Sequence, residues 1–313
     1  MSIKSELLFV RGREGEITLL DSVVEYPLSS IAIFGLDFTS APSIRKPITC
    51  AVCELRVTTL RIQACLSFAQ FDAFEQFLQR PGPWLLACDF PFGQPQKLIN
   101  NLGWPFAWPD YVATVHAMGK ALFNQTMISY SRKRLAGDKL HLRLADKLAG
   151  AISPMMMYRV PVGKMFFEGA PRLLRSGVSV LPCYPQPDTR VVVEGYPAIV
   201  ARRWLGRRSY KSDERARQTL EQRQARIELL DAICSDALDA AYGVRIDLTE
   251  DMRQRLIDDP RADQLDAVLC AIQAAWAYHQ RSQNYGIPPG FEADGWIVDP
   301  LLLQLHKASR SKK

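Results

Sequence analysis

The 313-residue sequence has only four histidines and lacks any long apolar run. His116, His141, His279 and His306 do not show the spacing of metal ligands, which disfavours a zinc site and histidine catalysis. No uninterrupted apolar span is long enough to cross a bilayer, and the opening MSIKSELLFVRGREGE has no apolar segment typical of a signal peptide. These absences predict a cytoplasmic protein that has no membrane partner.

The sequence also lacks the cysteine pattern of a disulfide or zinc framework. It has seven cysteines, an odd number, and the single CxxC motif, Cys50 to Cys53, has no second CxxC or histidine pair near it. We expect buried, reduced thiols. The net charge of +6 is compatible with a polyanionic partner without requiring one.

Three apolar runs each end in an acidic residue. The first begins at Ile31 and leads through Gly35 to Asp37, the second (WLLACD) ends at Asp89, and the third (TRVVVE) ends at Glu194. Runs without polar alternation predict strands that are buried on both faces. Functional groups in such sheets gather beyond one end of the strands, so we expect these acids to lie at one edge. Two further strands are predicted at 48–54 and 56–68.

Residues 263–276 (DQLDAVLCAIQAAW) predict the last strong helix. Asp263 and Asp266 are spaced i, i+3 and lie together at the margin of its apolar stripe. A helix this apolar must pack against the core, so its acids should reach the edge where Asp37 and Asp89 lie.

Four carboxylates held close together would repel one another and take up protons unless a cation were present. Mg²⁺ or Mn²⁺ suits oxygen ligands and leaves positions for phosphate and water. Two such ions about 4 Å apart can activate a water and stabilise the leaving oxygen of a phosphodiester. Simpler interpretations exist for single residues: Asp89 as a turn residue, Asp263 as an ordinary acid at a helix start, and Glu194 as an ion-pair partner of Arg202 or Arg203.

Five segments together, in their order, resemble the predicted RNase H-like nucleases of domain of unknown function 429: GLDFTSAP, ACDFPFG, VEGYPA with a following YKS, DQLDAVLCAIQAA and GWIVDP. The resemblance runs from about Ile31 to Pro300. The last helix is also similar to that of RuvC-type Holliday-junction resolvases. The resemblance implies an α/β fold in which helices flank an RNase H-like mixed sheet of five strands. The first three of these strands are antiparallel.

The resemblance implies a role for each acid. Asp37 would be the metal ligand of the first strand, Asp89 that of the fourth strand, and Asp263 and Asp266 those of the C-terminal helix. Glu194 would be an additional catalytic acid. Resolvases carry Glu at the fourth-strand position, and the shorter Asp89 leaves open whether one or two ions bind.

We expect one RNase H-like domain over residues 29–300 with a helical insertion at about 112–150. An N-terminal arm or edge strands (1–28) precede it and a basic C-terminal tail (301–313) follows, whose lysine-rich end HKASRSKK is expected to be frayed. Around the acids, Thr39 and Ser40 could hydrogen-bond a phosphate or a metal-bound water. Four further residues could hold a phosphate backbone, although a solvated helix face explains the arginines equally well: Arg202, Arg203, Tyr210 and Lys211.

The sequence therefore predicts a metal-dependent nuclease that acts on DNA or RNA, and a homodimer if it cuts two strands as resolvases do. One alternative is a non-catalytic module of the same fold that binds nucleic acid or protein. A weaker alternative is an ATP-dependent phosphotransferase, since the Gly-rich second phosphate loop of those enzymes is not visible.

Overall fold

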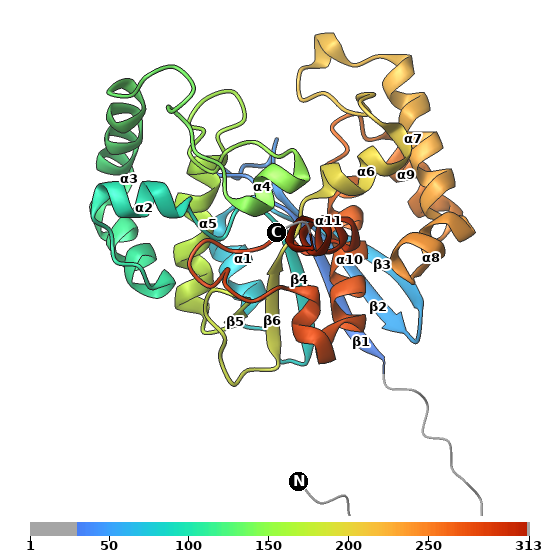
Figure 1. Ribbon diagram of the computed structural model, residues 1–313. Helices are drawn as coiled ribbons and strands as arrows, with labels where there is room; N and C mark the ends of the chain where they lie inside the picture. The colour runs from blue at the N-terminus through green and yellow to red at the C-terminus, as the bar shows by residue number, and fades with distance from the viewer. Residues whose placement is uncertain (1–29, 312–313) are drawn as a thin grey trace, which may run out of the picture.

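Residues 30–311 are described by the computed structural model, and they form a seven-stranded mixed sheet with helices on both faces (Figure 1). The arm or edge strands expected at 1–28 lie outside the described residues. Across the sheet the strands follow the order β5 (Ser179–Val180), β6 (Arg190–Glu194), β4 (Trp84–Asp89), β1 (Ile31–Asp37), β2 (Ile48–Arg56), β3 (Thr59–Phe68) and β7 (Arg245–Asp247).

The predicted mixed sheet flanked by helices is confirmed, but the predicted number of five strands is wrong. All five predicted strands are present, and β1, β2 and β3 are antiparallel as expected. Strands β1, β4 and β6 run parallel to one another. The two additional strands, β5 and β7, have two and three residues at the edges of the sheet. Such short segments are below the length at which a hydrophobic period can be recognised.

Two apolar cores fill the space between the sheet and its helices. One face packs against α1 (Phe71–Leu78), α2 (Gln96–Leu102), α3 (Trp108–Arg132) and α5 (Val162–Ser176). The other packs against α4 (Leu144–Ala149), α6 (Pro197–Leu205), α7 (Leu220–Ile233), α8 (Asp236–Tyr242), α9 (Glu250–Asp258), α10 (Asp263–His279) and α11 (Pro300–Arg310). Figure 1 shows α2, α3 and α5 to one side of the sheet and α7, α8 and α9 to the other. None of the helices within 30–311 is both long enough and apolar enough to span a membrane.

Three local expectations need correction. The helical pattern read at 112–150 is interrupted, because α3 has a break at Gly119 and ends at Arg132 before α4 begins. The helical pattern read from 198 to 241 is broken by the 206–219 segment, in which only Arg215–Arg217 form a short 3₁₀ turn. That segment is rich in charge and has too few apolar residues to give a helix a buried stripe. The C-terminal tail is not frayed up to Arg310, because residues 300–310 form α11. The Asp299 side chain caps the start of this helix. The expected single domain stays a prediction.

A close contact between β1 and α10 positions the end of the sheet. A Cβ atom on Gly35 would lie 2.0 Å from the Ala267 carbonyl oxygen and 2.2 Å from the Ala271 amide nitrogen. The helix backbone therefore rests directly on the strand, which is possible only because position 35 has no side chain. One consequence is that the first turn of α10, with Asp263 and Asp266, begins beside the strand end at Asp37.

Replacing Gly35 by alanine should push α10 away from the sheet. We expect Gly35→Ala to lower the free energy of unfolding by about 3 kcal/mol or more, because the new methyl group meets rigid backbone atoms. Denaturant unfolding measures this loss. The control is Gly103→Ala, where a Cβ would meet nothing within 4 Å and only the left-handed backbone (φ +65°) is unfavourable. Its expected cost is about 1–2 kcal/mol. Equal losses in the two variants would contradict the steric explanation.

Candidate functional site

Two of the predicted acids lie side by side where parallel strands end. Asp37 and Asp89 are register partners at the ends of β1 and β4. Successive strand residues alternate between the two faces of a sheet. Gly35 and Ala87, two positions earlier, both face the core that contains α10, so Asp37 and Asp89 face that side too. The predicted convergence of these two acids is thus reproduced by the register.

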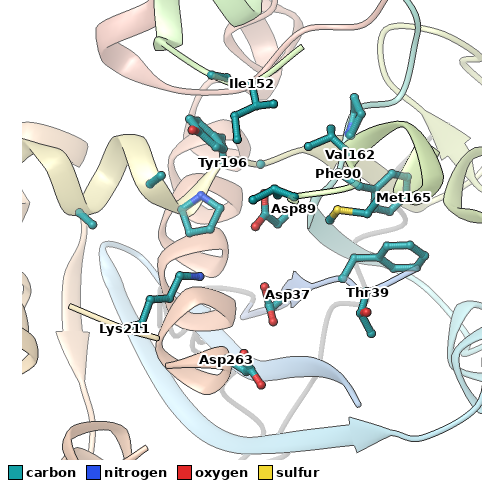
Figure 2. A pocket seen from close by; sticks show the side chains of 18 of the residues that line it. Asp37, Thr39, Asp89, Phe90, Ile152, Val162, Met165, Tyr196, Lys211 and Asp263 are labelled. Carbon is teal, nitrogen blue, oxygen red and sulfur yellow. The ribbon is translucent and has the colours of Figure 1, made fainter. Parts of the chain in front are cut away.

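Asp37 and Asp89 open into a cavity of about 780 Å³. Figure 2 shows their carboxylates near Asp263 and Lys211. Of the residues predicted to bind substrate, the cavity lining includes Thr39, Ser40, Arg202, Tyr210 and Lys211. Arg203 does not contribute to this lining, and its guanidinium lies instead 5.5 Å from the centroid of the Tyr242 ring.

The electrostatics of the strand ends favour protonated carboxyls. Burial raises the pKa of Asp37 well above its ordinary range, and Asp266, Asp89 and Asp263 raise it further, while the Lys211 ammonium opposes them. Burial, together with Asp266, raises the pKa of Asp89 to about 7. Burial also raises the pKa of Asp263. Carboxyls with pKa values perturbed in this way are frequent at functional sites.

Asp266 is fully buried and already has two partners. The Tyr210 hydroxyl donates to its Oδ1 at 2.5 Å, and the Lys211 ammonium donates to its Oδ2 and forms an ion pair with it. Burial alone lowers the pKa of Lys211, but the Asp266 carboxylate outweighs this effect and holds the pKa well above its ordinary value. Lys211 thus supplies the positive charge that the acidic cluster needs.

The partners that the four acids have in the structure can be compared with the predicted metal site. Within the part of the chain that the structure describes, no group of three or more His, Cys, Asp or Glu side chains is placed so that it could hold a metal ion. Asp263 is in an ion pair with Arg261 at 3.6 Å and Asp266 is paired with Lys211, whereas Asp37 and Asp89 are in neither pair. The oxygen donors and the raised pKa values of Asp37 and Asp89 fit a hard divalent ion. A third carboxylate ligand would have to leave its present partner.

Glu194 is at the end of β6 as predicted and lines the same cavity as Asp37 and Asp89, but it already has a partner in Arg143. Its register partner is Cys88, so its side chain leaves β6 one position out of phase with that of Asp89, at a part of the cavity wall that Arg143 and Asp146 also line. There it accepts bonds from Arg143 Nη2 at 2.5 Å, from Nη1 at 2.8 Å and from the Phe92 amide at 3.0 Å. The alternative pairing with Arg202 or Arg203 is also wrong.

Arg143 is the residue that sequence reasoning missed. It is buried, it pairs with both Glu194 and Asp146, and it donates to the Asp294 carbonyl oxygen at 2.8 Å. In the sequence it stands among several basic residues that are typical of a solvated helix face. Asp146 is a local partner three positions away, but the partners that bury Arg143 at the cavity, Glu194 and Asp294, are 51 and 151 positions away in the sequence.

Comparison with known proteins gives one match. The model of a family described as "Protein of unknown function (DUF429)" matches residues 35–289, which is more than half of the chain. A search of curated proteins and a search of solved structures found no match.

We expect Asp89→Asn to stabilise the protein above neutral pH. With a folded-state pKa of about 7 against 3.8 when unperturbed, the native state holds a proton that the unfolded state has released between these values. Stability therefore falls as pH rises through this window. Asparagine does not titrate and avoids this loss. The free energy of unfolding of the variant should match that of wild type near pH 4 and exceed it at pH 8 by up to about 4 kcal/mol. Chemical unfolding at both pH values measures this.

Glu194→Gln is the matched contrast, since Glu194 is compensated by Arg143. This substitution removes one partner of a buried ion pair and should lower the free energy of unfolding at pH 8 by roughly 3 kcal/mol. A higher free energy of unfolding at pH 8 for Glu194→Gln, or a lower one for Asp89→Asn, would contradict this assignment. It would mean that Asp89, and not Glu194, is the carboxylate with a compensating partner.

Proposed function

The chain belongs to the DUF429 family, and we propose that it is a divalent-metal-dependent nuclease that hydrolyses phosphodiester bonds of DNA or RNA. The observation that carries the proposal is the pair of buried carboxylates, Asp37 and Asp89, which form no ion pair within residues 30–311 and open into a cavity with basic residues around it. Their raised pKa values are a cost that a bound cation would offset. The order of the five longer strands, with β1, β2 and β3 antiparallel, supports an RNase H-like arrangement.

Asp37 and Asp89 would hold one Mg²⁺ or Mn²⁺, with Asp263 or Asp266 as a further ligand once it leaves its partner. The bound ion would lower the pKa of a water and polarise the phosphate. Lys211 would then remain close enough to neutralise phosphate charge, a role that a flexible ammonium with three donors can fill. Thr39 and Ser40 line the same cavity and supply hydroxyl groups to a phosphate oxygen.

The starts of two helices lie at the cavity, and one of them supports phosphate binding there. Pro197 and Ala198, in the first turn of α6, and Val162, in the first turn of α5, line the cavity. Neither helix has a side-chain hydrogen bond at its N-cap. The Val162 and Gly163 amides of α5 already donate to the Val160 and Met156 carbonyl oxygens, so the positive end of α6 near Ala198 is the one that could attract an anion here.

One observation favours the second candidate, a non-catalytic binding module. Because Lys211 and Tyr210 engage Asp266, the cluster is already partly neutralised without a metal. A protein with this arrangement could bind nucleic acid through its basic residues while the acids serve stability alone. Metal binding separates the two candidates.

Calorimetric titration with Mn²⁺ tests the proposal. We expect wild type to bind Mn²⁺ and to cleave at least one member of a panel of branched, duplex, single-stranded and hybrid nucleic acids. Asp37→Asn removes a ligand and should weaken Mn²⁺ binding by more than about tenfold and abolish cleavage. The matched control is Asp72→Asn, an exposed acid at the start of α1, which should leave both unchanged.

The outcomes are distinct. Binding without cleavage of any panel member would retain the metal site and contradict the nuclease assignment. Absence of Mn²⁺ binding by wild type would overturn the proposal in favour of the binding module.

A further inference from the structure

The cavity has an apolar part that phosphodiester hydrolysis does not require. Its side chains come from five separate places in the chain: Phe38 after β1, Phe90 after β4, Ile152 after α4, Val162 and Met165 on α5, and Tyr196 before α6. In Figure 2, Ile152 and Tyr196 lie to one side of Asp89, and Phe90, Val162 and Met165 lie to the other. Apolar walls thus stand directly beside the proposed catalytic acid.

The apolar side chains at this end are accessible to solvent. Ile152 is 40% exposed, and Val160, which also lines the cavity, is 50% exposed. The neighbouring Tyr158 is 62% exposed. Exposed apolar side chains grouped beside a cavity mark a place where a ligand or partner binds.

The aromatic wall is held in place before any ligand binds. The Tyr196 hydroxyl accepts a bond from Arg202 Nη2 at 3.0 Å, and the Arg202 guanidinium lies 5.4 Å from the ring centroid. Arg202 is fixed in turn by the Ala149 carbonyl oxygen at 2.9 Å. An aromatic ring beside a planar guanidinium provides flat surfaces on which a base can stack.

The size and charge of the cavity agree with one nucleotide. Its volume of about 780 Å³ lies in the range of small-molecule sites, about 300–1,000 Å³. Arg159 and Arg207 line it together with Arg202, which gives positive charge next to apolar walls. A base inside a continuous duplex cannot reach such walls, because its faces are covered by its neighbours in the stack.

We propose that the apolar part of the cavity binds one unpaired nucleobase, with the adjoining phosphate at Asp37 and Asp89. This proposal rests on the proposed nuclease function and narrows its substrate class to single-stranded segments or extruded nucleotides. A continuous duplex is excluded as the preferred substrate.

A single-stranded DNA of about 16 nucleotides that carries one 2-aminopurine provides the test, since the fluorescence of this base responds to stacking and the strand is long enough to form a stable duplex with its complement. The titration is done in EDTA, so that it does not depend on the metal site. We expect a saturable change with the single strand and at least about tenfold weaker binding of the same strand in a duplex. Base stacking of about 1–3 kcal/mol corresponds to a difference of this size.

Two variants locate the base. Ile152→Asp and Met165→Asp place a charge on opposite walls, and each should weaken single-strand binding by about tenfold. Leu135→Asp is the control, because Leu135 is 84% exposed and lies outside the cavity lining. Circular dichroism is used to check that all three variants are folded. We expect Ile152→Asp to fold, because Ile152 is 40% exposed.

The results separate this proposal from the nuclease function. Duplex binding as tight as single-strand binding, no saturable signal, or wild-type affinity in Ile152→Asp would each overturn the base site, whatever the Mn²⁺ titration shows. Single-strand binding that Ile152→Asp weakens, in a chain that does not bind Mn²⁺, would support the base site and contradict only the nuclease.

Discussion

The direct contact of α10 with β1 at Gly35 determines where the acidic residues lie. Because the helix backbone rests on the strand without an intervening side chain, the first turn of α10 is held at the level of the strand ends. A side chain between the two elements would move Asp263 and Asp266 away from Asp37 and would change the shape of the cavity floor. The small residues along α10, Ala267 and Ala271, allow the same approach from the helix side. The packing of α10 on β1 therefore determines both the structure of the core and the positions of the acids at the site.

The buried charges near the strand ends are compensated in two different ways. At the end of β6, Arg143 is buried with Glu194 and Asp146, and its guanidinium satisfies both carboxylates through several hydrogen bonds. In the first turn of α10, Asp266 is a single carboxylate paired with Lys211, whose side chain is 42% exposed and extends from the 206–219 segment. The first arrangement has the geometry of a permanent structural ion pair. The second involves one flexible side chain, which can leave without disturbing the core.

Sequence reasoning succeeded where the information is local. The unbroken apolar runs that end at Asp37 and Asp89 predict buried strands, and the apolar stripe behind Asp266 predicts a packed helix. It failed where the outcome depends on register or on distant partners. Whether Glu194 faces Asp89 or Arg143 depends on a shift of one residue between β4 and β6, which no pattern within either strand specifies. The ion pair of Lys211 with Asp266 could not be predicted, because the helical pattern gave no sign that α6 ends at Leu205 and that residues 206–219 are not helical.

The energetic cost of Asp37 and Asp89 argues that they serve a ligand. A carboxyl whose pKa is raised by burial destabilises the native state at neutral pH. Burial raises the pKa of Glu194 as well, but Arg143 opposes that effect through two hydrogen bonds, whereas Asp37 and Asp89 form no ion pair within the described residues. Asparagine at either position would have nearly the same shape without this cost. Residues that are unfavourable for folding and that open into a cavity are the ones for which a functional explanation is needed. In the function that we propose, a hard cation would neutralise the charge, and the apolar walls beside Asp89 would bind a flat and weakly hydrated group. A nucleotide joined to a metal ion combines both in one ligand, which a purely structural role for the acids does not explain.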